Sequence, residues 1–322
     1  MKNTVLFIVG PTAVGKTEYA IETALACNGE IVSADSMQLY KYMDIGSAKP
    51  TLEERAIVPH YLVDEIDPGT PFSAAQYQKL AKSYISMIFD KGKVPIVSGG
   101  TGLYVNSLIY EMDFSARPAE KGFREQLELE AKTLGTLHLH EKLRLADPEA
   151  AARIHPNNIK KIIRAIEITH VSGDGAKSFE KSFQPVKDYD VVMIGLTRDR
   201  EELYRRINER TDLLFAMGLV DEVRRLLSDG LLKTDIAMQG IGYKEIIDHL
   251  NGSCTLDEAI ETVKRSSRNY AKRQLTWFRR FDAIEWFNLS EYSGRQEAMK
   301  EVLEWIAMKS DIITNRTSRT TL

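Results

Sequence analysis

The sequence predicts an α/β protein in which a parallel sheet is flanked by helices and interrupted by a helical insertion domain. Three observations predict this fold. Short β-branched runs alternate with helical patterns in the first third of the chain, as in parallel sheets whose crossover helices cover both faces. A long polar-rich helical stretch without a strand pattern follows. A further buried run then returns the chain to the sheet, so the helical stretch is an insertion.

In chain order, the first part of the sheet comes from three short apolar runs. We expect strands over residues 5–9, 30–33 and 94–98, because each run is short, β-branched and ends at a turn that contains glycine or aspartate. We expect helices over residues 16–27, 73–89 and 103–109. Ligands of parallel sheets bind beyond the carboxyl ends of the strands. The segments that leave these ends should therefore line one crevice: residues 10–17, 35–38 and 99–104.

The rest of the chain supplies the insertion, the second part of the core and a tail. We expect the core over residues 1–114 and 190–310, the helical insertion domain over residues 115–189, and a disordered tail over residues 311–322. Residues 170–183 are rich in turn formers, and residues 190–196 form another expected strand. After Arg198 the pattern is mostly helical, with a late strand candidate at residues 283–287.

The composition argues against membrane, secreted and disulfide-rich classes. A chain with 43% hydrophobic and 28% charged residues is an ordinary globular protein. No apolar run reaches the roughly 18 residues of a membrane span, and the first apolar run leads into a glycine loop rather than a signal-peptide cleavage site. Cys27 and Cys254 lie far apart without metal-binding spacing, which is typical of free thiols in a reducing compartment. We therefore expect a cytoplasmic protein.

The stretch GPTAVGKT, residues 10–17, matches the phosphate-binding pattern G-x-x-x-x-G-K-[ST] at every fixed position. It follows an expected strand and opens an expected helix, which is the context that this motif requires. Backbone amides and the helix N-terminus would hold phosphate oxygens. Lys16 would add a point charge, and the Thr17 hydroxyl could bind Mg²⁺. The core is therefore predicted to be a P-loop-type parallel sheet.

Asp35, in VSADSMQLY, follows the second expected strand and should face the same crevice. A carboxylate there could hold Mg²⁺ or act as a general base. It could equally form an Asx turn or cap a helix, as most aspartates after strands do. From this stretch alone, the two interpretations carry equal weight.

The third expected strand ends in IVSGGTGLY, where a nucleotide hydrolase would carry the acidic residue that holds a metal against the γ-phosphate. Here the strand ends in Ser98, Gly99, Gly100 and Thr101, with no carboxylate. Glycines let the backbone approach a ligand closely, and Thr101 offers a hydroxyl, although an ordinary tight turn would read the same way. The missing acid argues against a conventional hydrolase or motor.

An arginine-rich stretch, TRDREELYRRINERTD, falls on or just before an expected helix. Glutamates interleave with the arginines, so i,i+4 ion pairs are one interpretation. The other directs one or two arginines into the crevice to neutralise a diphosphate, which the planar guanidinium suits. The arginines are Arg198, Arg200, Arg205, Arg206 and Arg210.

A second cationic stretch, residues 264–280, carries seven lysines and arginines and no acid, in a chain whose net charge is −3. Tyr270, Trp277 and Phe278 interleave with these charges. Cationic groups beside stacking surfaces hold single-stranded nucleic acid, so the segment predicts a polyanionic partner on one face. A solvated helix face is the alternative.

Seven motifs in this order resemble the tRNA dimethylallyltransferase family, the isopentenyl-tRNA transferases of bacteria. The resemblance extends over about residues 4–306. The motifs are GPTAVGKT, DSMQLY, SGGTGLY, HPNNIKKIIRAIEI, RDREELYRRINER, QGIGYKEI and NYAKRQLTWFRR. The first alone would be unspecific, but the ordered set is highly specific.

The resemblance implies an alkyl transfer. A dimethylallyl group would pass from dimethylallyl diphosphate to the exocyclic amine of the adenosine 3′ of the anticodon in tRNA, with release of diphosphate. The implied cofactor is Mg²⁺, and the implied partners are dimethylallyl diphosphate and the tRNA anticodon stem-loop, which the insertion would clamp through shape and phosphates. We expect no membrane partner and a monomer. The P-loop would then hold a leaving group, and no second acidic motif would be needed.

The resemblance also implies roles for single residues. Asp35 would accept the proton of the amine, while Thr101 and Arg210 would help to stabilise charge on the leaving diphosphate. Gln38 would read the base edge. Diphosphate binding would come from Gly10, Pro11, Thr12, Ala13, Val14, Gly15, Lys16 and Thr17, with Mg²⁺ at Thr17. Binding of tRNA would come from Asp35, Ser36, Met37, Gln38, Lys160, Lys161, Ile162, Ile163, Arg164, Arg273, Gln274, Trp277 and Arg280.

The chain departs from the family pattern at two places. Val14 stands where the family commonly has serine, so one possible hydroxyl contact in the loop is missing. Lys160 and Lys161 stand where the family commonly has Gln-Arg. The lysines keep the positive charge but change the hydrogen bonds that this segment can make.

Two other functions compete with this interpretation. A small-molecule kinase with a P-loop would share the fold, Lys16 and Asp35, but it leaves the missing second acid, the insertion and the aromatic and basic segment unexplained. An RNA-binding module that uses nucleotide only as a switch would need a γ-phosphate sensor, and the sequence offers no candidate.

Overall fold

The computed structural model describes residues 3–112, 114, 121–172 and 184–310. The chain divides into two compact units, one of Met1–Ile109 and Val186–Leu322 and one of Tyr110–Pro185, and each is described by itself. The second unit covers most of the predicted insertion. The predicted tail, residues 311–322, and residues 173–183 of the turn-rich stretch lie outside the described residues.

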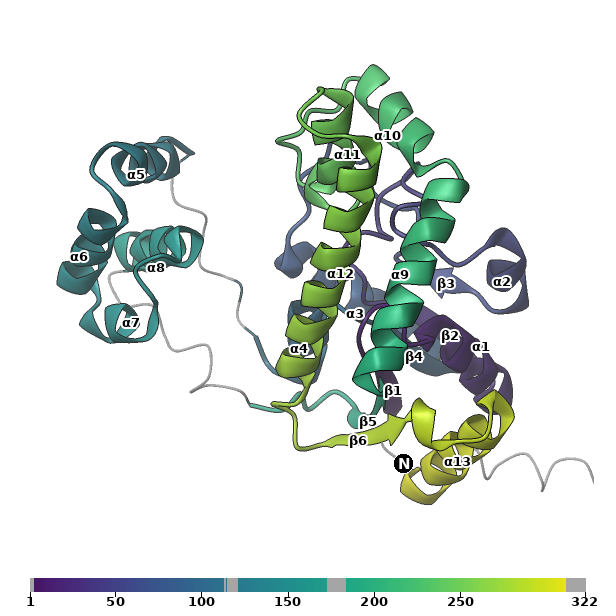
Figure 1. Cartoon of the computed structure of the whole chain (residues 1–322). Coiled ribbons are helices and arrows are strands. Elements are labelled where there is room, and N and C mark those ends of the chain that lie inside the picture. Colours follow the sequence, from purple (N-terminus) through teal and green to yellow (C-terminus); the bar gives the residue numbers. More distant parts are fainter. Residues whose placement is uncertain (1–2, 113, 115–120, 173–183, 311–322) are drawn as a thin grey trace, which may run out of the picture. The chain divides into compact units, whose positions relative to one another are not determined.

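The first unit is built on a parallel sheet whose strand order among the described residues is β3-β2-β4-β1-β5-β6 (Figure 1). The strands are β1 (Thr4–Val9), β2 (Gly29–Ser33), β3 (His60–Tyr61), β4 (Val94–Gly99), β5 (Asp190–Thr197) and β6 (Ile284–Asn288). The predicted parallel α/β core is therefore confirmed, late strand included. Strand β3 was not predicted, because two residues are too few to show a pattern.

Helices cover both faces of this sheet. Residues 5–9 of the central strand β1 have no exposed surface, as expected where both faces are covered. Leu6 and Ile8 belong to a core cluster shared with α1 (Lys16–Cys27) and α13 (Arg295–Lys309). Helix α3 (Ala74–Asp90) packs on β2 and β4 and against α4 (Gly102–Ile109). A short 3-10 turn, η2 (Leu289–Glu291), leads from β6 toward α13.

The C-terminal helices of the first unit form a second core. Helices α9 (Arg200–Ala216) and α12 (Leu256–Phe278) run side by side (Figure 1). Helices α10 (Leu219–Ser228) and α11 (Tyr243–Leu250), with the 3-10 turn η1 (Ala237–Gln239), enclose Tyr40 and Met43 in a hydrophobic cluster. Because both residues belong to the connection between β2 and α2 (Leu52–Ile57), this cluster anchors that connection. None of the described helices combines the length and the apolar character needed to cross a bilayer.

The second unit is a cluster of helices around its own core. It contains, among its described residues, α5 (Lys121–Thr133), α6 (Thr136–Ala146), α7 (Pro148–Arg153) and α8 (Ile159–Ser172). Arg124 of α5 binds the buried Glu167 of α8 at two points, Nε to Oε1 at 2.6 Å and Nη2 to Oε2 at 2.8 Å. Burial raises the pKa of Glu167, but the hydrogen bonds and charge of Arg124 outweigh it and lower the pKa overall. This pair ties the two helices together.

The carboxylate of Glu30, at the start of β2, is buried in a network of donors. It accepts hydrogen bonds from the Tyr61 hydroxyl at 2.7 Å, from Lys91 Nζ at 2.9 Å and from Lys93 Nζ at 2.6 Å. Burial alone would raise the pKa of Glu30, but these three hydrogen bonds outweigh it and hold the pKa at about 2. The network therefore stabilises the ionised form of Glu30 and, through Tyr61, ties β2 to the edge strand β3.

We expect Glu30 to make folding sensitive to acid. Its pKa in the folded chain lies below the ordinary 4.5, so its contribution is complete above about pH 4.5 and is lost as the pH falls toward 2. The free energy of unfolding of the wild type, minus that of Glu30→Gln, should shrink by about 2 kcal/mol between pH 6 and pH 3. Urea unfolding of both chains across this range measures the difference, and a pH-independent difference would contradict the assignment.

Candidate active site

A cleft with a volume of about 910 Å³ lies where the sequence predicts the crevice. Its walls come from the P-loop, from the segment after β2, from the end of β4 and from helices α9 and α12. The segments that leave β1 and β2 therefore meet in one cleft as predicted, whereas of the predicted residues 99–104 only Gly99 lines it. Residues of the predicted site that line the cleft are Thr12, Ala13, Gly15, Lys16, Thr17, Asp35, Ser36, Met37, Gln38, Arg210, Arg273 and Gln274.

Two glycines let the strand ends approach one another. A side chain at Gly10, whose φ is +152°, would come within 2.5 Å of the carbonyl oxygen of Leu196 in β5. A side chain at Gly99 would overlap the backbone of Ala34, just after β2. The glycine at the end of β4 thus serves packing between neighbouring chain segments, and it keeps the P-loop and the Asp35 segment close together.

Val14 of the P-loop points into the core. Its side chain is fully buried in the cluster that α1 and α13 share with the sheet. The loop carbonyls, by contrast, are bound by arginines: Arg206 Nε donates to the carbonyl of Ala13 at 2.9 Å and Arg198 Nε to that of Val14 at 3.1 Å. The departure from serine at Val14 therefore adds apolar packing beneath the loop. The two arginines fix the loop backbone through their hydrogen bonds to its carbonyls.

Lys16 projects over the loop and donates from Nζ to the carbonyl of Pro11 at 2.8 Å. Burial lowers the pKa of Lys16 to about 8; the charge of Asp35 raises it, and that of Arg210 lowers it. An anion bound in the cleft would stabilise the protonated form of Lys16, because it would replace the lost hydration of the ammonium group. The P-loop is thus poised for an anionic ligand.

Asp35 forms the Asx turn that one interpretation of its motif expects, and it also lines the cleft. Its Oδ1 accepts from the backbone amide of Met37 at 2.9 Å, which is an Asx turn, and the residue lines the cleft. Thr101 supports the same segment, since its Oγ1 accepts from the amide of Ser36 at 3.0 Å. The turn therefore orients a carboxylate toward the cleft, and the Thr101 hydroxyl holds the Asp35 segment rather than lining the cleft itself.

The arginine-rich stretch divides between the two interpretations. Arg198 and Arg205 form i,i+4 ion pairs with Glu202 and Glu209 at 2.6 and 2.8 Å. Arg210, by contrast, lines the cleft together with Arg206. Burial lowers the pKa of Arg210 and the charge of Asp35 raises it, so the guanidinium lies near the carboxylate. Of the five arginines, Arg210 is thus the one best placed for a diphosphate.

Helix α12 is bound to the P-loop by Gln274. The side chain is 5% exposed. Its Oε1 accepts from the amide of Thr12 at 2.9 Å, and its Nε2 donates to the carbonyl of Gly100 at 3.0 Å. Both ends of the amide are therefore engaged with backbone, and Gln274 joins the P-loop to the end of β4. No spacing in the sequence indicates this role, because the partners lie far apart in the chain.

The aromatic side chains near the end of α12 are buried or half-buried, whereas Arg273 on the helix and Arg280 just after it are exposed. Phe278 is fully buried, so this aromatic residue of the cationic stretch belongs to the core and offers no stacking surface to nucleic acid. Trp277 is half-buried and donates from Nε1 to Asn106 Oδ1 at 3.2 Å. Arg280 lies over the Trp277 ring at 5.1 Å and Arg273 over the Tyr270 ring at 5.6 Å. The exposed arginines are thus held by the aromatic rings beneath them.

Tyr270 reaches the same part of the cleft. Burial, and then the charge of Asp35, raise the pKa of Tyr270 to about 12. Its hydroxyl stays protonated at neutral pH and is a hydrogen-bond partner of Thr101. The site therefore contains a neutral phenol beside Asp35 as well as the two predicted cations, Lys16 and Arg210.

In the second unit, the predicted tRNA-binding stretch is only partly available to a ligand. Lys160 and Lys161 are exposed, and Arg164 is half-buried with Nη1 3.4 Å from Glu167 Oε2. Ile162 and Ile163 are buried in the core of the unit. The prediction that these two side chains contact RNA is therefore wrong, because the face of α8 that carries them packs against the other helices of the unit.

Part of the cleft wall is apolar. Ile45, Ile241, Leu213, Leu214 and Met217 line it, and Leu213 and Met217 are more than half exposed, at 58% and 57%. Such side chains in a cleft are available to an apolar ligand group. Sequence reasoning named no residues of this wall, because they come from α9, from the connection after β2 and from the QGIGYKEI motif, which meet only in the fold.

Comparison with known proteins identifies the family of the chain. The family model described as IPP transferase matches residues 38–281. A curated tRNA dimethylallyltransferase of Alkaliphilus oremlandii is 52% identical over 304 residues, covering 94% of this chain and 97% of the relative. The full-length tRNA isopentenylpyrophosphate transferase of Bacillus halodurans has a similar structure, with a TM-score of 0.72, 44% identity, and coverage of 96% of this chain and 97% of that one.

A eukaryotic dimethylallyltransferase described as acting on tRNA is also similar in structure. Its TM-score is 0.82 at 27% identity, and the match covers 98% of this chain and 80% of that one. The family model alone spans more than half of the chain, and the relatives match nearly all of it. The chain therefore belongs to the IPP transferase family, the family of the tRNA dimethylallyltransferases.

Proposed function

We propose that this chain transfers a dimethylallyl group from dimethylallyl diphosphate to the exocyclic amine of the adenosine 3′ of the anticodon in tRNA, releasing diphosphate. One observation carries the proposal most directly. A P-loop with Lys16, the cation Arg210 and the carboxylate Asp35 share one cleft, while the β4 end beside them carries no acid for γ-phosphate chemistry. This arrangement suits departure of a diphosphate and removal of a proton.

The chemistry assigns one role to each side of the cleft. The lone pair of the adenine amine forms a bond to the first carbon of the dimethylallyl group. The carbon–oxygen bond to the diphosphate breaks, and its electron pair stays on the diphosphate oxygen. Asp35 takes the proton that the alkylated amine loses and later gives it to solvent. The amine is a weak nucleophile, so removal of the proton as the bond forms matters most.

Charge develops on the departing diphosphate, and the P-loop side stabilises it. The P-loop that carries Lys16 is held in place before the reaction by hydrogen bonds of Gln274, Arg198 and Arg206, and Arg210 lines the same cleft. Donors that are fixed in advance stabilise such charge without reorganising. The apolar wall of the cleft would enclose the dimethylallyl group.

The donor set fits a Mg²⁺ ion that takes most of its ligands from substrate. Among the described residues no cluster of three or more histidine, cysteine or acidic side chains forms a metal cage. Magnesium is usually held by one or two protein oxygens with phosphates and water, and the Thr17 hydroxyl and Asp35 carboxylate both line the cleft. We assign the ion to Thr17. When bound, Mg²⁺ neutralises charge on the diphosphate.

The tRNA partner is proposed to meet the exposed cations of α12 and of α8. Arg273 and Arg280 lie over aromatic rings on α12, and Lys160 and Lys161 are exposed on α8. The target adenosine must leave its stack to reach a cleft, which costs a few kcal/mol. The proposal includes the anticodon stem-loop as the part of tRNA that binds, a monomer as the acting form, and the cytoplasm as its location.

We expect tRNA binding to weaken steeply with salt. Each phosphate that a cation neutralises makes the negative slope of log K against log[salt] steeper by about 0.7 to 0.9. Replacing Arg273 and Arg280 together by glutamine should make the slope about 1.5 units shallower. Titration of the stem-loop at four salt concentrations measures both slopes. The matched control is Arg205→Gln, since Arg205 pairs with Glu209 on exposed α9 surface and should leave the slope unchanged. A salt-independent affinity would contradict the charged interface.

One reaction separates the proposal from its two rivals. The chain is incubated with unmodified tRNA, Mg²⁺ and either dimethylallyl diphosphate or ATP. A mass gain of one dimethylallyl unit on an anticodon-loop adenosine supports the transferase. Phosphate release from ATP, with no gain on tRNA from dimethylallyl diphosphate, would support a kinase or a nucleotide switch instead.

A further inference from the structure

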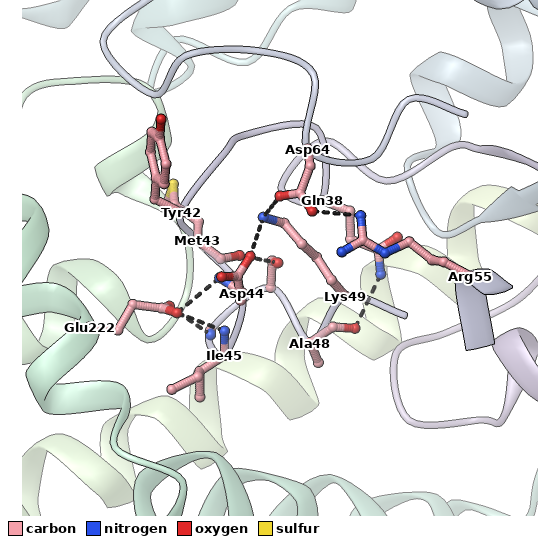
Figure 2. A network of polar contacts seen from close by, with 12 residues as sticks. Gln38, Tyr42, Met43, Asp44, Ile45, Ala48, Lys49, Arg55, Asp64 and Glu222 are labelled. Atoms are coloured by element: carbon pink, nitrogen blue, oxygen red, sulfur yellow. Dashed lines mark hydrogen bonds and ion pairs between the residues drawn. The ribbon is translucent and has the colours of Figure 1, made fainter. Parts of the chain in front are cut away.

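A buried carboxylate behind the cleft is bound by donors of the cleft wall. Glu222 of α10 is 3% exposed. Its Oε2 accepts from the amides of Asp44 at 2.9 Å and Ile45 at 2.8 Å, and its Oε1 accepts from the amide of Gly46 at 3.0 Å and the hydroxyl of Tyr243 at 2.8 Å. Figure 2 shows the Glu222 side chain directed at this stretch of backbone. One carboxylate therefore satisfies four donors that converge on it.

The residues that Glu222 holds belong to a tight loop, residues 43–49. A side chain at Gly46 would overlap the Tyr243 ring, and Ala48 has a left-handed φ of +44°. Lys49 pairs with Asp44 at 2.6 Å and with Asp64. A non-glycine residue in this conformation persists only where its surroundings fix it. The 43–49 loop is therefore held in one shape by Glu222, by the ring of Tyr243 and by the Lys49 pairs.

The hydrogen bonds continue from the loop to Gln38 (Figure 2). The carbonyl of Ile45 accepts from the amide of Ala48 at 2.9 Å, and the carbonyl of Ala48 accepts from Gln38 Nε2 at 3.3 Å. On the other side, Gln38 Oε1 accepts from the Ser33 hydroxyl at 3.0 Å. A hydroxyl can donate or accept, but a carbonyl can only accept. The Ala48 oxygen therefore decides which end of the Gln38 amide is the nitrogen.

We propose that Glu222 is a positioning residue for recognition of the target base. By holding the 43–49 loop, it makes Ala48 present its carbonyl to Gln38, and the Gln38 amide keeps one N–H and one lone pair for the base edge. The inference rests on the proposed function and on the role that the family resemblance implies for Gln38, reading of the base edge. Glu222 itself lies behind the loop and acts through it.

The Glu222→Gln variant tests this role, because it keeps the shape of the side chain and turns one acceptor into a donor that faces backbone N–H groups. We expect KM for the anticodon stem-loop to rise about tenfold, because Gln38 is misplaced, while KM for dimethylallyl diphosphate rises by a smaller factor, because Ile45 of the same loop belongs to the apolar wall of the cleft. In a Gln38→Ala background the same change should add no further rise, since residues that act through one another are not additive.

Two further variants separate positioning from stability. Glu30→Gln alters an equally buried carboxylate that does not line the cleft and has no contact with the 43–49 loop, and it should lower the melting temperature without moving KM for the stem-loop. Tyr243→Phe keeps the ring against Gly46 and removes one donor, so it should raise that KM in the same direction by a smaller factor, even if Glu222→Gln fails to fold. Equal changes in both KM values, or additive effects of Glu222→Gln and Gln38→Ala, would overturn the proposal.

Hydrogen exchange tests the loop without any substrate. The amides of Asp44, Ile45 and Gly46 should exchange at least about tenfold faster in Glu222→Gln than in the wild type, because they lose a buried acceptor. Unchanged exchange would overturn the inference even if transfer is observed. If the wild type transfers no dimethylallyl group, the proposed function is refuted. Faster exchange in Glu222→Gln would then support only the statement that Glu222 holds the 43–49 loop.

Discussion

Asp35→Asn is expected to slow dimethylallyl transfer by about 10²–10⁴-fold while stem-loop binding stays within about twofold. The asparagine Oδ1 can still accept from the Met37 amide, so the turn after β2 is preserved. What is lost is a group that can take the proton from the alkylated amine. Single-turnover formation of modified adenosine, measured beside direct titration of the stem-loop, separates the chemical step from binding.

Asp67→Asn is the matched control for this variant. Asp67 forms the same kind of turn, with Oδ1 accepting from the amide of Gly69 at 3.1 Å, and it is exposed rather than in the cleft. The Asp67→Asn variant should transfer the dimethylallyl group at the wild-type rate. If Asp35→Asn keeps a rate within about tenfold of the wild type, the carboxylate is not the proton acceptor and the Asx turn is its whole role.

Lys16→Met should lower kcat/KM for dimethylallyl diphosphate by about 10²–10³-fold. The methionine fills similar space without the charge, so the loop keeps its shape and loses its cation next to the leaving oxygen. Steady-state rates at saturating stem-loop measure the loss. Lys300→Met, on the exposed surface of α13, is the control and should show none. A loss below about tenfold would place the leaving group elsewhere in the cleft.

The pH dependence gives a second view of Lys16. Burial lowers its pKa to about 8, so below pH 8 the free enzyme carries the charge that binds a diphosphate, and above pH 8 it does not. We therefore expect kcat/KM for dimethylallyl diphosphate to fall as the pH rises through about 8, since this parameter reports on the free enzyme. In Lys16→Arg the fall should disappear, because a guanidinium stays charged. A fall that persists unchanged in Lys16→Arg belongs to another group.

The parts of the fold that the sequence predicts are those with local signals. The strands that became β1, β2, β4 and β5 each form an apolar run with turn residues at its end, and the P-loop has a fixed pattern of spacing. Once the strands are parallel, their carboxyl ends share an edge, and the crevice follows from topology alone. This is why the sequence alone predicts that the Lys16 and Asp35 segments share one cleft.

The parts that the sequence misses depend on pairs far apart in the chain. Gln274 binds the amide of Thr12, 262 residues away, and Glu222 binds amides of residues 44–46 across 176 to 178 positions. Neither pair leaves a local pattern. Phe278 and Ile162 lie in helical segments that are rich in charged residues. The charge pattern therefore predicts that they are exposed, whereas both side chains are buried in a core. Which face of an amphipathic helix is buried depends on what packs against it.

The structure gives the arginines of this stretch different partners, which the charge pattern alone could not distinguish. Arg198 and Arg206 bind P-loop carbonyls through Nε, whereas Arg210 faces Lys16 and Asp35. Arg198 and Arg206 therefore fix the backbone of the P-loop, and Arg210 adds a cation to the same cleft. Both uses fit a loop whose ligand leaves as an anion rather than one that passes a phosphoryl group onward.

The stoichiometry of released anion tests the leaving-group account most directly. Unmodified tRNA, dimethylallyl diphosphate and Mg²⁺ are incubated with the wild-type chain, and diphosphate, orthophosphate and modified adenosine are quantified in the same sample. The account predicts one diphosphate for each modified adenosine, no orthophosphate, and no release of either when ATP replaces dimethylallyl diphosphate. Orthophosphate released from ATP, or diphosphate released without modified adenosine, would contradict it.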